Sequence, residues 1–345
     1  MTSRGRGLGG KPLSGESPLL GGRTAAPDEP RLGTAIHAVA GAEDSGGRVA
    51  EFDARADEYV SPAEPQASRG NLPDLRALLP ASDEERALDD WGRSERFVSL
   101  IEPALNFYYR YWFRVETEVI ENIPSEWGAL LVSNHSGALP PDAPMVMQAI
   151  RNEHSSPRPL YMLGEHWFKG YPGVGMITNK LGLVAAHREN AQRLLFDEGR
   201  LAIVFPEGQK GSRKLYWQRY RLRRFGRGGF VRTAIRARVP IVPIALVGGE
   251  EAMPIFAHLR FMQRISGLIY FPLNHAFPHF GLAAGLMYMP AKFKIRFLEP
   301  VDMATYSPDT AEDPAEVQNI AEEIRTRIQL ELDQMVGERR SVWFG

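Results

Sequence analysis

The chain has 345 residues and 43% hydrophobic content, which is enough to bury a large core in one or two domains. Its 41 Lys and Arg residues nearly balance 42 Asp and Glu residues, so the protein as a whole is not a basic nucleic-acid binder. The absence of cysteine excludes disulfides, thiolate metal sites and cysteine nucleophiles.

Membrane-spanning and secretory signals are also missing from the pattern. No uninterrupted apolar run reaches the roughly 18 to 20 residues that a spanning helix needs. The nearest candidate, residues 265–290, is broken by Pro272, Asn274, His275, Pro278 and His279. The N-terminus lacks the apolar core of a secretory signal. We therefore expect a cytoplasmic protein that is peripheral on a membrane.

Residues 1–80 are predicted to be a disordered tail. They hold twelve Gly and eight Pro but only two aromatic residues, Phe52 and Tyr59, so they cannot bury enough apolar surface to offset the entropy of ordering. The stretch Gly5 to Pro12 resembles a phosphate-binding loop, but Pro12 stands where Ser or Thr is required. We interpret that match as chance.

Residues 81–114 are predicted to form an amphipathic helical segment. Ser82 and Glu85 have the spacing of a helix-capping pair. After Gly92 an apolar stripe with three-and-four spacing runs through Phe97, Ile101, Leu105, Tyr108 and Trp112, and Pro103 should kink this helix. Aromatic residues beside Arg110 and Arg114 favour a helix at a membrane interface, and a helix packed on the core fits the stripe equally well.

From residue 115 onward, short apolar runs alternate with helical stretches. Runs of this length between helices predict an α/β fold with a mostly parallel, mixed sheet and flanking helices. The expected strands are Val115–Ile120, Ala129–Val132, Leu160–Leu163, Leu201–Phe205, Ile241–Val247 and Phe293–Leu298. A last helix, capped by Asp313 with Pro314 in its first turn, should run to Gly337 and cover the sheet.

The stretch Ser133 to Ala143 holds the strongest candidate for chemistry. It follows a buried run and precedes a predicted helix, so His135 should lie at the exposed end of a strand with Asp142 further along the loop. A His held by a carboxylate is suited to taking a proton from a hydroxyl. Asp142 could instead cap the helix, and one carboxylate has enough oxygens for both roles.

Four sequence blocks in order resemble the glycerolipid acyltransferase superfamily, whose members move an acyl group from a thioester to a lipid hydroxyl. The resemblance spans roughly Arg114 to Pro300 and makes residues 115–345 an acyltransferase domain. Six residues separate His135 from Asp142, where the superfamily usually has four, and this variant resembles the monoacylglycerol and diacylglycerol acyltransferase-like branch. The blocks are NHSGALPPD (134–142), GLVAAHRENA (182–191), VFPEG (204–208) and VPIVPIALVG (239–248).

The resemblance implies roles for individual residues. His135 would be the general base and Asp142 would fix its ring. Glu207 and Gly208 would hold the polar head of the acceptor, with binding of loop amides as the alternative for Glu207. Arg188, after a strand-like segment at Gly182, matches a phosphate-binding Arg, with a surface ion pair as the alternative. The other implied substrate-binding residues are Asn134, Ser136 and Gly137.

The segment from Arg200 to Arg238 holds twelve Lys and Arg residues against one acid, Glu207. This concentration favours binding of lipid head groups or donor phosphates, and Lys210 and Arg213 are expected nearest the site. A solvated helix face would explain it as well. Aromatic residues within the basic run, Tyr216, Trp217 and Tyr220, would also suit nucleic acid, but the four blocks argue against that partner.

The expected substrates are an acyl thioester, acyl-CoA or an acyl carrier, and a lipid alcohol, with no cofactor. An acyl chain of about 16 carbons carries ~12 kcal/mol of transfer free energy, so the enzyme should meet it at a membrane through residues 97–113 or 268–289. No metal is expected, because Pro278 breaks a helix between His275 and His279. A lipid-binding protein without turnover is the alternative, and a hydrolase is disfavoured because no GxSxG motif exists.

Overall fold

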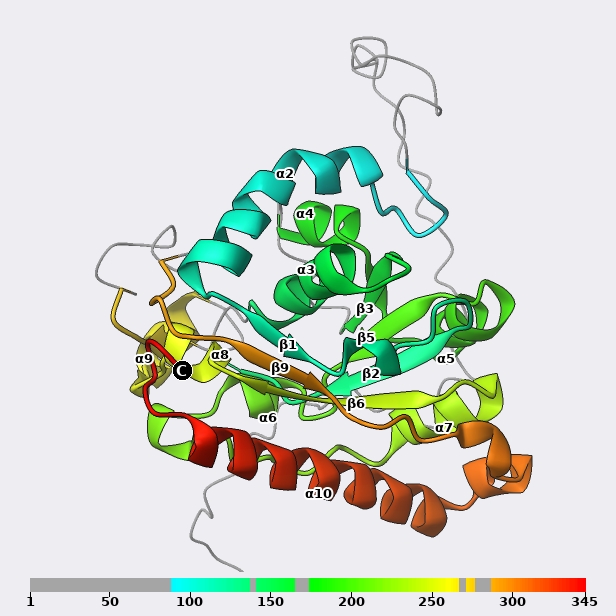
Figure 1. The fold of residues 1–345 in the computed structure, drawn as a ribbon. Helices are drawn as coiled ribbons and strands as arrows, with labels where there is room; N and C mark the ends of the chain where they lie inside the picture. The colour runs from blue at the N-terminus through cyan, green and yellow to red at the C-terminus, as the bar shows by residue number, and fades with distance from the viewer. Residues whose placement is uncertain (1–87, 137–140, 165–173, 267–270, 277–286) are drawn as a thin grey trace, which may run out of the picture. The chain divides into compact units, whose positions relative to one another are not determined.

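The computed structural model describes residues 88–136, 141–164, 174–266, 271–276 and 287–345 (Figure 1). The predicted tail, the Ser82 cap and Gly137 lie outside these residues, as does most of the apolar stretch 268–289. The predicted domain boundaries therefore stay predictions.

A seven-stranded sheet with the order β1-β9-β6-β2-β5-β3-β4 forms the centre of the described fold. The five strands from β6 to β4 are parallel to one another, whereas β9 is antiparallel to β6 and parallel to β1. This confirms the predicted mostly parallel, mixed sheet. The strands are β1 (Glu116–Glu118), β2 (Ala129–Ser133), β3 (Leu160–Gly164), β4 (Leu183–Ala185), β5 (Leu201–Val204), β6 (Ile241–Val247) and β9 (Lys294–Phe297).

Helices cover both faces of the sheet, with α2 and α3 on one side and α7 and α10 on the other (Figure 1). The helices are α2 (Glu95–Phe107), α3 (Asp142–Glu153), α4 (Val174–Lys180), α5 (Arg188–Gln192), α6 (Gln209–Ser212), α7 (Gly229–Ala237), α8 (Gly249–Ala252), α9 (Arg260–Ser266) and α10 (Pro314–Glu338). Two short strands, β7 (Ala257–His258) and β8 (Pro272–Leu273), pair beside α9.

Strand β2 shows why the centre of the sheet is apolar on both faces. All five of its residues are buried. Leu130 and Val132 pack into the core under α7 and α10, and Ala129 and Leu131 pack into the core under α3. Because side chains alternate between the faces of a strand, a continuous apolar run is what a strand covered on both faces requires.

The last helix confirms the predicted cap. The Asp313 carboxylate accepts hydrogen bonds from the backbone N–H groups of Ala315 and Glu316, at 2.8 and 3.3 Å, and Pro314 occupies the first turn. The apolar residues that recur at helical spacing along this helix, from Val317 to Met335, are buried against the sheet.

The helix with the aromatic stripe both packs on the core and leaves apolar side chains exposed. It contains Pro103 and continues into a π-helical turn, Tyr108–Trp112. Tyr109 and Phe113 are buried, whereas Leu100 is 75% exposed and Tyr111 71% exposed. Among the described residues, no helix combines the length and apolar character needed to cross a bilayer.

Candidate active site

His135 lies two residues beyond β2, at the carboxyl edge of the parallel strands, where α/β folds place their ligand sites. Its Nδ1 is 3.2 Å from Asp142 Oδ2, and its ring stacks on Phe205 at a centroid distance of 4.4 Å. Because an ionised carboxylate only accepts hydrogen bonds, this contact assigns the ring proton to Nδ1. The lone pair of neutral His135 is then on Nε2, and 17% of the side chain is exposed.

Asp142 is completely buried, and its carboxylate is held by neighbours of His135. Its Oδ2 accepts the Ser136 N–H at 2.9 Å, and its Oδ1 accepts the Ser136 hydroxyl. Asp142 is the first residue of α3, but Pro141 is the cap residue and makes no side-chain cap hydrogen bond. The positive end of the helix dipole still favours a carboxylate there. The longer spacing therefore brings His135 and Asp142 together, and orientation of the ring describes the contacts better than capping does.

Two glycines allow this close packing. A Cβ atom on Gly249 would lie 2.1 Å from Ser136 Oγ and 2.6 Å from Asp142 Oδ1. A Cβ atom on Gly211 would lie 2.6 Å from Glu207 Cβ and 3.0 Å from His135 Cβ. Both positions were missed from the sequence, since nothing in the chain pattern reveals which distant side chain approaches a glycine.

The Glu207 carboxylate binds the backbone of His135. Its Oε1 accepts the His135 N–H at 3.1 Å and its Oε2 accepts the Arg223 N–H at 2.8 Å. The side chain has no exposed area, so the alternative role, binding of loop amides, describes its contacts. The predicted contact with the acceptor's head group is not supported by this placement. Gly208, at a φ of 54°, turns the chain from Glu207 into α6.

A buried cluster of charges lies behind Glu207. Lys214 Nζ is 3.4 Å from Glu207 and 2.7 Å from Glu250 Oε1, and its side chain is 1% exposed. Burial opposes a charge on Lys214, but the two carboxylates outweigh it and raise the pKa of its ammonium group. Burial, together with repulsion from Glu207 and Asp142, raises the pKa of Glu250 to about 7 despite Lys214.

No role was predicted for Lys214 or Glu250, although the two acids at 250 and 251, directly after a buried strand, indicated polar groups at the same sheet edge. Glu250 also accepts the Tyr220 N–H, and Glu251 is 2.6 Å from Arg339 of the segment after α10. Lys214 is thus shared between the carboxylates of Glu207 and Glu250 behind the His135 loop.

The residues beside His135 are tied to the protein. The Asn134 carboxamide donates to the Leu246 carbonyl at 2.9 Å and accepts the Leu246 N–H at 2.8 Å, which joins the end of β2 to β6. Ser136 is 1% exposed and bonded to Asp142. These contacts position the loop, and the predicted binding of substrate by Asn134 and Ser136 stays a prediction.

A basic pocket opens beside the Glu207 loop, with a volume of about 390 Å³. Lys210 is exposed in it. Arg213 lies in it too, and its carbonyl is bonded to His258 Nε2 at 2.9 Å. The same Arg223 whose N–H binds Glu207 contributes its side chain to the wall. The pocket is lined by Lys210, Arg213, Leu215, Gln218, Arg223 and His258.

Arg188 is exposed at the start of α5, directly after β4. Strands β5 and β3 lie between β2 and β4, so about 14 Å of sheet separates its strand from that of His135. Its charge acts on Glu312, which is paired with Arg236 at 2.5 Å. The phosphate role of Arg188 stays a prediction.

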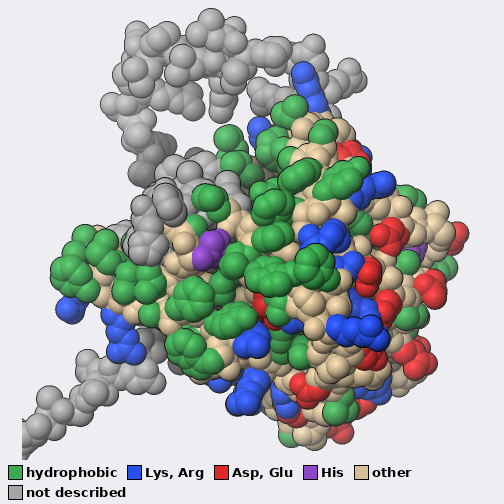
Figure 2. All heavy atoms as spheres, turned by 60° about the vertical axis from the view of Figure 1, so that its left-hand side comes forward, with side chains coloured by type: hydrophobic (Ala, Val, Ile, Leu, Met, Phe, Trp, Pro, Cys, Tyr) green, Lys and Arg blue, Asp and Glu red, His purple; other side chains and the backbone are tan. Residues whose placement is uncertain are grey.

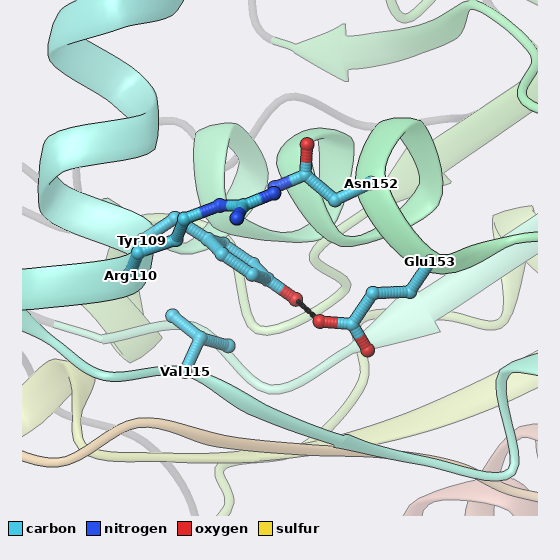
Figure 3. A pocket seen from close by; sticks show the side chains of 5 residues that line it. All are labelled: Tyr109, Arg110, Val115, Asn152 and Glu153. Atoms are coloured by element: carbon cyan, nitrogen blue, oxygen red, sulfur yellow. Dashed lines mark hydrogen bonds between the residues drawn. The ribbon is translucent and has the colours of Figure 1, made fainter.

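A second pocket, of about 350 Å³, lies at the other end of α3 (Figure 3). It is lined by Tyr109, Arg110, Val115, Asn152 and Glu153, and the Tyr109 hydroxyl points at the Glu153 carboxylate, 2.5 Å away. Glu153 lies eleven positions after Asp142 on this helix, which corresponds to a rise of ~16 Å. This pocket is therefore separate from the His135 site. Within the described ranges, no three potential ligand side chains gather as a metal site.

An α/β sheet with a carboxylate-supported His at its carboxyl edge and a basic pocket beside it has the parts of an enzyme site with a general base. The family model described as Acyltransferase matches residues 114–247. An uncharacterized protein of Mycobacterium tuberculosis is 40% identical over 260 residues, which cover 75% of this chain and 72% of that protein. The chain belongs to the glycerolipid acyltransferase superfamily and is an acyltransferase.

Two more distant similarities are to proteins whose function is named. A chicken protein named DGAT1/2-independent enzyme synthesizing storage lipids is 27% identical over 227 residues, 65% of this chain and 62% of that protein. The crystal structure of the 1-acyl-sn-glycerophosphate acyltransferase PlsC from Thermotoga maritima aligns with a TM-score of 0.45 and 20% identity, covering 77% of this chain and 88% of that one.

Proposed function

We propose that this acyltransferase moves an acyl group from an acyl thioester, acyl-CoA in the first instance, to a hydroxyl of a glycerolipid, with His135 as the general base. One observation carries the proposal: Asp142 lies 3.2 Å from Nδ1 of the ring, which leaves Nε2 as the nitrogen that can accept a proton, and the His135 side chain is partly exposed. A base in this arrangement needs no metal or covalent nucleophile.

The proposed reaction has two proton transfers. Neutral His135 accepts the proton of the acceptor hydroxyl at Nε2 as the oxygen attacks the thioester carbonyl carbon. The carbon–sulfur bond then breaks, and the thiolate leaves and takes the proton from the imidazolium. Asp142, 3.2 Å from Nδ1, stabilises the imidazolium between the two transfers. General-base catalysis of this kind typically raises the reaction rate by a factor of about 10² to 10⁴.

The charge of the basic pocket suits a substrate that carries an anionic group. Lys210, Arg213 and Arg223 would bind a phosphate of the donor or of the acceptor beside the loop that carries Glu207. Glu207, by binding the His135 N–H, would keep the base at a fixed distance from that group. A peripheral position on a membrane, reached from the cytoplasm, would give the site access to an acceptor that does not dissolve in water.

The test is acyl transfer by the purified full-length protein, using labelled acyl-CoA and vesicles that contain candidate lipid alcohols. His135→Ala should reduce turnover by about 10² to 10⁴ while vesicle binding is unchanged. His187→Ala is the matched control, because His187 also follows a parallel strand, β4, but lies away from Asp142. Full activity in His135→Ala would refute the base, and absence of transfer by the wild type with every donor would favour a lipid-binding protein.

A further inference from the structure

Helix α9 is an element that buries almost nothing against its own protein. Phe261 is 73% exposed, Ile265 66% and Met262 36%, and none of the side chains described in this helix is buried. Positions 261, 262 and 265 share one side of a helix, so these side chains form one apolar face. A helix with a large apolar face in water is expected to have a partner for that face.

The charges of α9 indicate which kind of partner it fits. Arg260 and Arg264 are exposed and lie one turn apart beside the apolar face, and the helix contains no acidic residue. Large apolar side chains bordered by basic ones match the boundary between acyl chains and anionic head groups of a bilayer. The aliphatic part of each Arg can lie along the apolar layer while the guanidinium stays at the phosphates.

The helix is attached to the active-site loop. It lies between β7 and β8, whose pairing is extended by the hydrogen bond from Phe256 N–H to the Leu273 carbonyl, 2.8 Å long. His258 of β7 is bonded through Nε2 to the Arg213 carbonyl, in the chain segment that follows Glu207. This bond links the strand pair that carries α9 to the chain segment after Glu207.

Apolar side chains next to the start of β7 are exposed as well. Phe256 is 42% exposed and contacts Tyr216, and Trp217 is 61% exposed. Figure 2, which brings the left side of Figure 1 forward, shows hydrophobic side chains gathered over the centre and left of the view, with Lys and Arg side chains below and to the right of them. In Figure 1, α8 and α9 lie on the same side of the sheet, and α8 begins with Gly249, which packs on Asp142.

We propose that α9 docks the protein on an anionic lipid bilayer. Phe261 and Ile265 enter the interface between head groups and acyl chains, and Arg260 and Arg264 bind lipid phosphates. The purpose of this contact, delivery of His135 to a lipid acceptor, rests on the proposed function, but the contact itself does not. The docking element lies outside both segments that the sequence suggested, 97–113 and 268–289, and directly precedes the second of them.

The first experiment measures binding of the full-length protein to vesicles of phosphatidylcholine with about one quarter phosphatidylglycerol. The Phe261→Ser/Ile265→Ser double variant should bind about tenfold or more weakly. Leu330→Ser is the matched control, because Leu330 is 65% exposed on α10, and its binding should equal that of the wild type. Wild-type affinity in the double variant would overturn the proposal.

A second variant separates the basic residues from the apolar ones. Arg260→Gln/Arg264→Gln should remove most of the preference for anionic over neutral vesicles, and it should flatten the fall in binding with added salt. An unchanged preference would contradict the role given to the two arginines. A dimer in solution that the double Ser variant abolishes would assign the face to a second copy of the chain and overturn the lipid assignment.

Turnover distinguishes failure of docking from failure of the proposed function. With a short-chain thioester and a short-chain alcohol that are monomeric in water, the Phe261→Ser/Ile265→Ser variant should match the wild type. With the acceptor in vesicles, its turnover should fall in parallel with binding. Loss with the soluble pair as well would show that α9 acts in the site and overturn docking. Absence of turnover in the wild type would refute the function only, and weaker vesicle binding would still support α9.

Discussion

The two ends of helix α3 carry the same kind of group in different surroundings. At the N-terminal end, Asp142 is buried and binds Ser136 and the His135 ring. At the C-terminal end, Glu153 is exposed and accepts the hydroxyls of Tyr109 and Thr117, beside a pocket of about 350 Å³. Both carboxylates accept hydrogen bonds, Asp142 beside the His135 ring and Glu153 beside the pocket.

The difference is in what each carboxylate supports. Asp142 holds an imidazole, which can gain and lose a proton near neutral pH. Glu153 faces a phenol, and burial together with that carboxylate raises the pKa of Tyr109 further above its ordinary value, so Tyr109 keeps its proton. The helix dipole also favours the negative charge at Asp142 and disfavours it at Glu153. The two ends of α3 therefore differ in the group beside the carboxylate, an imidazole at Asp142 and a phenol at Glu153. It is the imidazole that makes the Asp142 end suited to proton transfer.

The largest effect should separate the two ends directly. Asp142→Asn is nearly isosteric but removes the charge that stabilises the imidazolium, and an amide N–H₂ facing Nδ1 moves the ring proton to Nε2 and blocks the base. Turnover should fall by about 10² to 10⁴. Glu153→Gln, the matched change at the other end, should leave turnover within about twofold. The measurement is steady-state acyl transfer by both variants. Similar losses of turnover in the two would contradict the distinction between the two ends of α3.

The second effect tests the buried charges behind the His135 end. Lys214→Met leaves Glu207 and Glu250 buried without their shared cation, at 3.4 and 2.7 Å in the wild type. Removing one partner of a buried ion pair costs roughly 3 to 5 kcal/mol of unfolding free energy. Urea unfolding measures it. Lys210→Met, at an exposed position, should change stability by less than about 0.5 kcal/mol, and equal effects of the two would contradict the cluster.

The smallest effect concerns the glycine that packs on Asp142. Gly249→Ala places a methyl group 2.1 Å from Ser136 Oγ, so stability should fall by about 1 to 3 kcal/mol and turnover by about tenfold or more. Gly337→Ala is the control in α10, where an added Cβ would meet nothing within 4 Å. It should raise stability by a few tenths to about 1 kcal/mol. Thermal unfolding of both proteins decides, and a harmless Gly249→Ala would mean that Asp142 is less tightly held.

Much of the fold was predictable because it depends on local pattern. The six expected apolar runs each contain a strand, and the Asp313 cap starts the last helix as expected. Strand β4, of three residues, was indicated only as a strand-like segment at Gly182. The pairing of β1 with β9, and the antiparallel pairing of β9 with β6, could not be predicted either, because they depend on contacts between residues far apart in the sequence.

The site was predictable in its residues but less so in their contacts. His135 and Asp142 are adjacent, and their motif carried that information. Glu207 was expected to face a ligand, but it faces the backbone of His135 and Lys214. Sequence order reveals which residues follow a strand, whereas the direction of a side chain depends on backbone turns such as the positive φ of Gly208.

The central claim is that Asp142 contributes to turnover through the His135 ring. The most direct test compares turnover of the wild type, His135→Ala, Asp142→Asn and the protein with both changes. Residues that act as one unit have non-additive effects, so the double variant should be about as slow as His135→Ala alone. If the two losses multiplied instead, Asp142 would act independently of the ring, and the assignment of a supported base would be wrong.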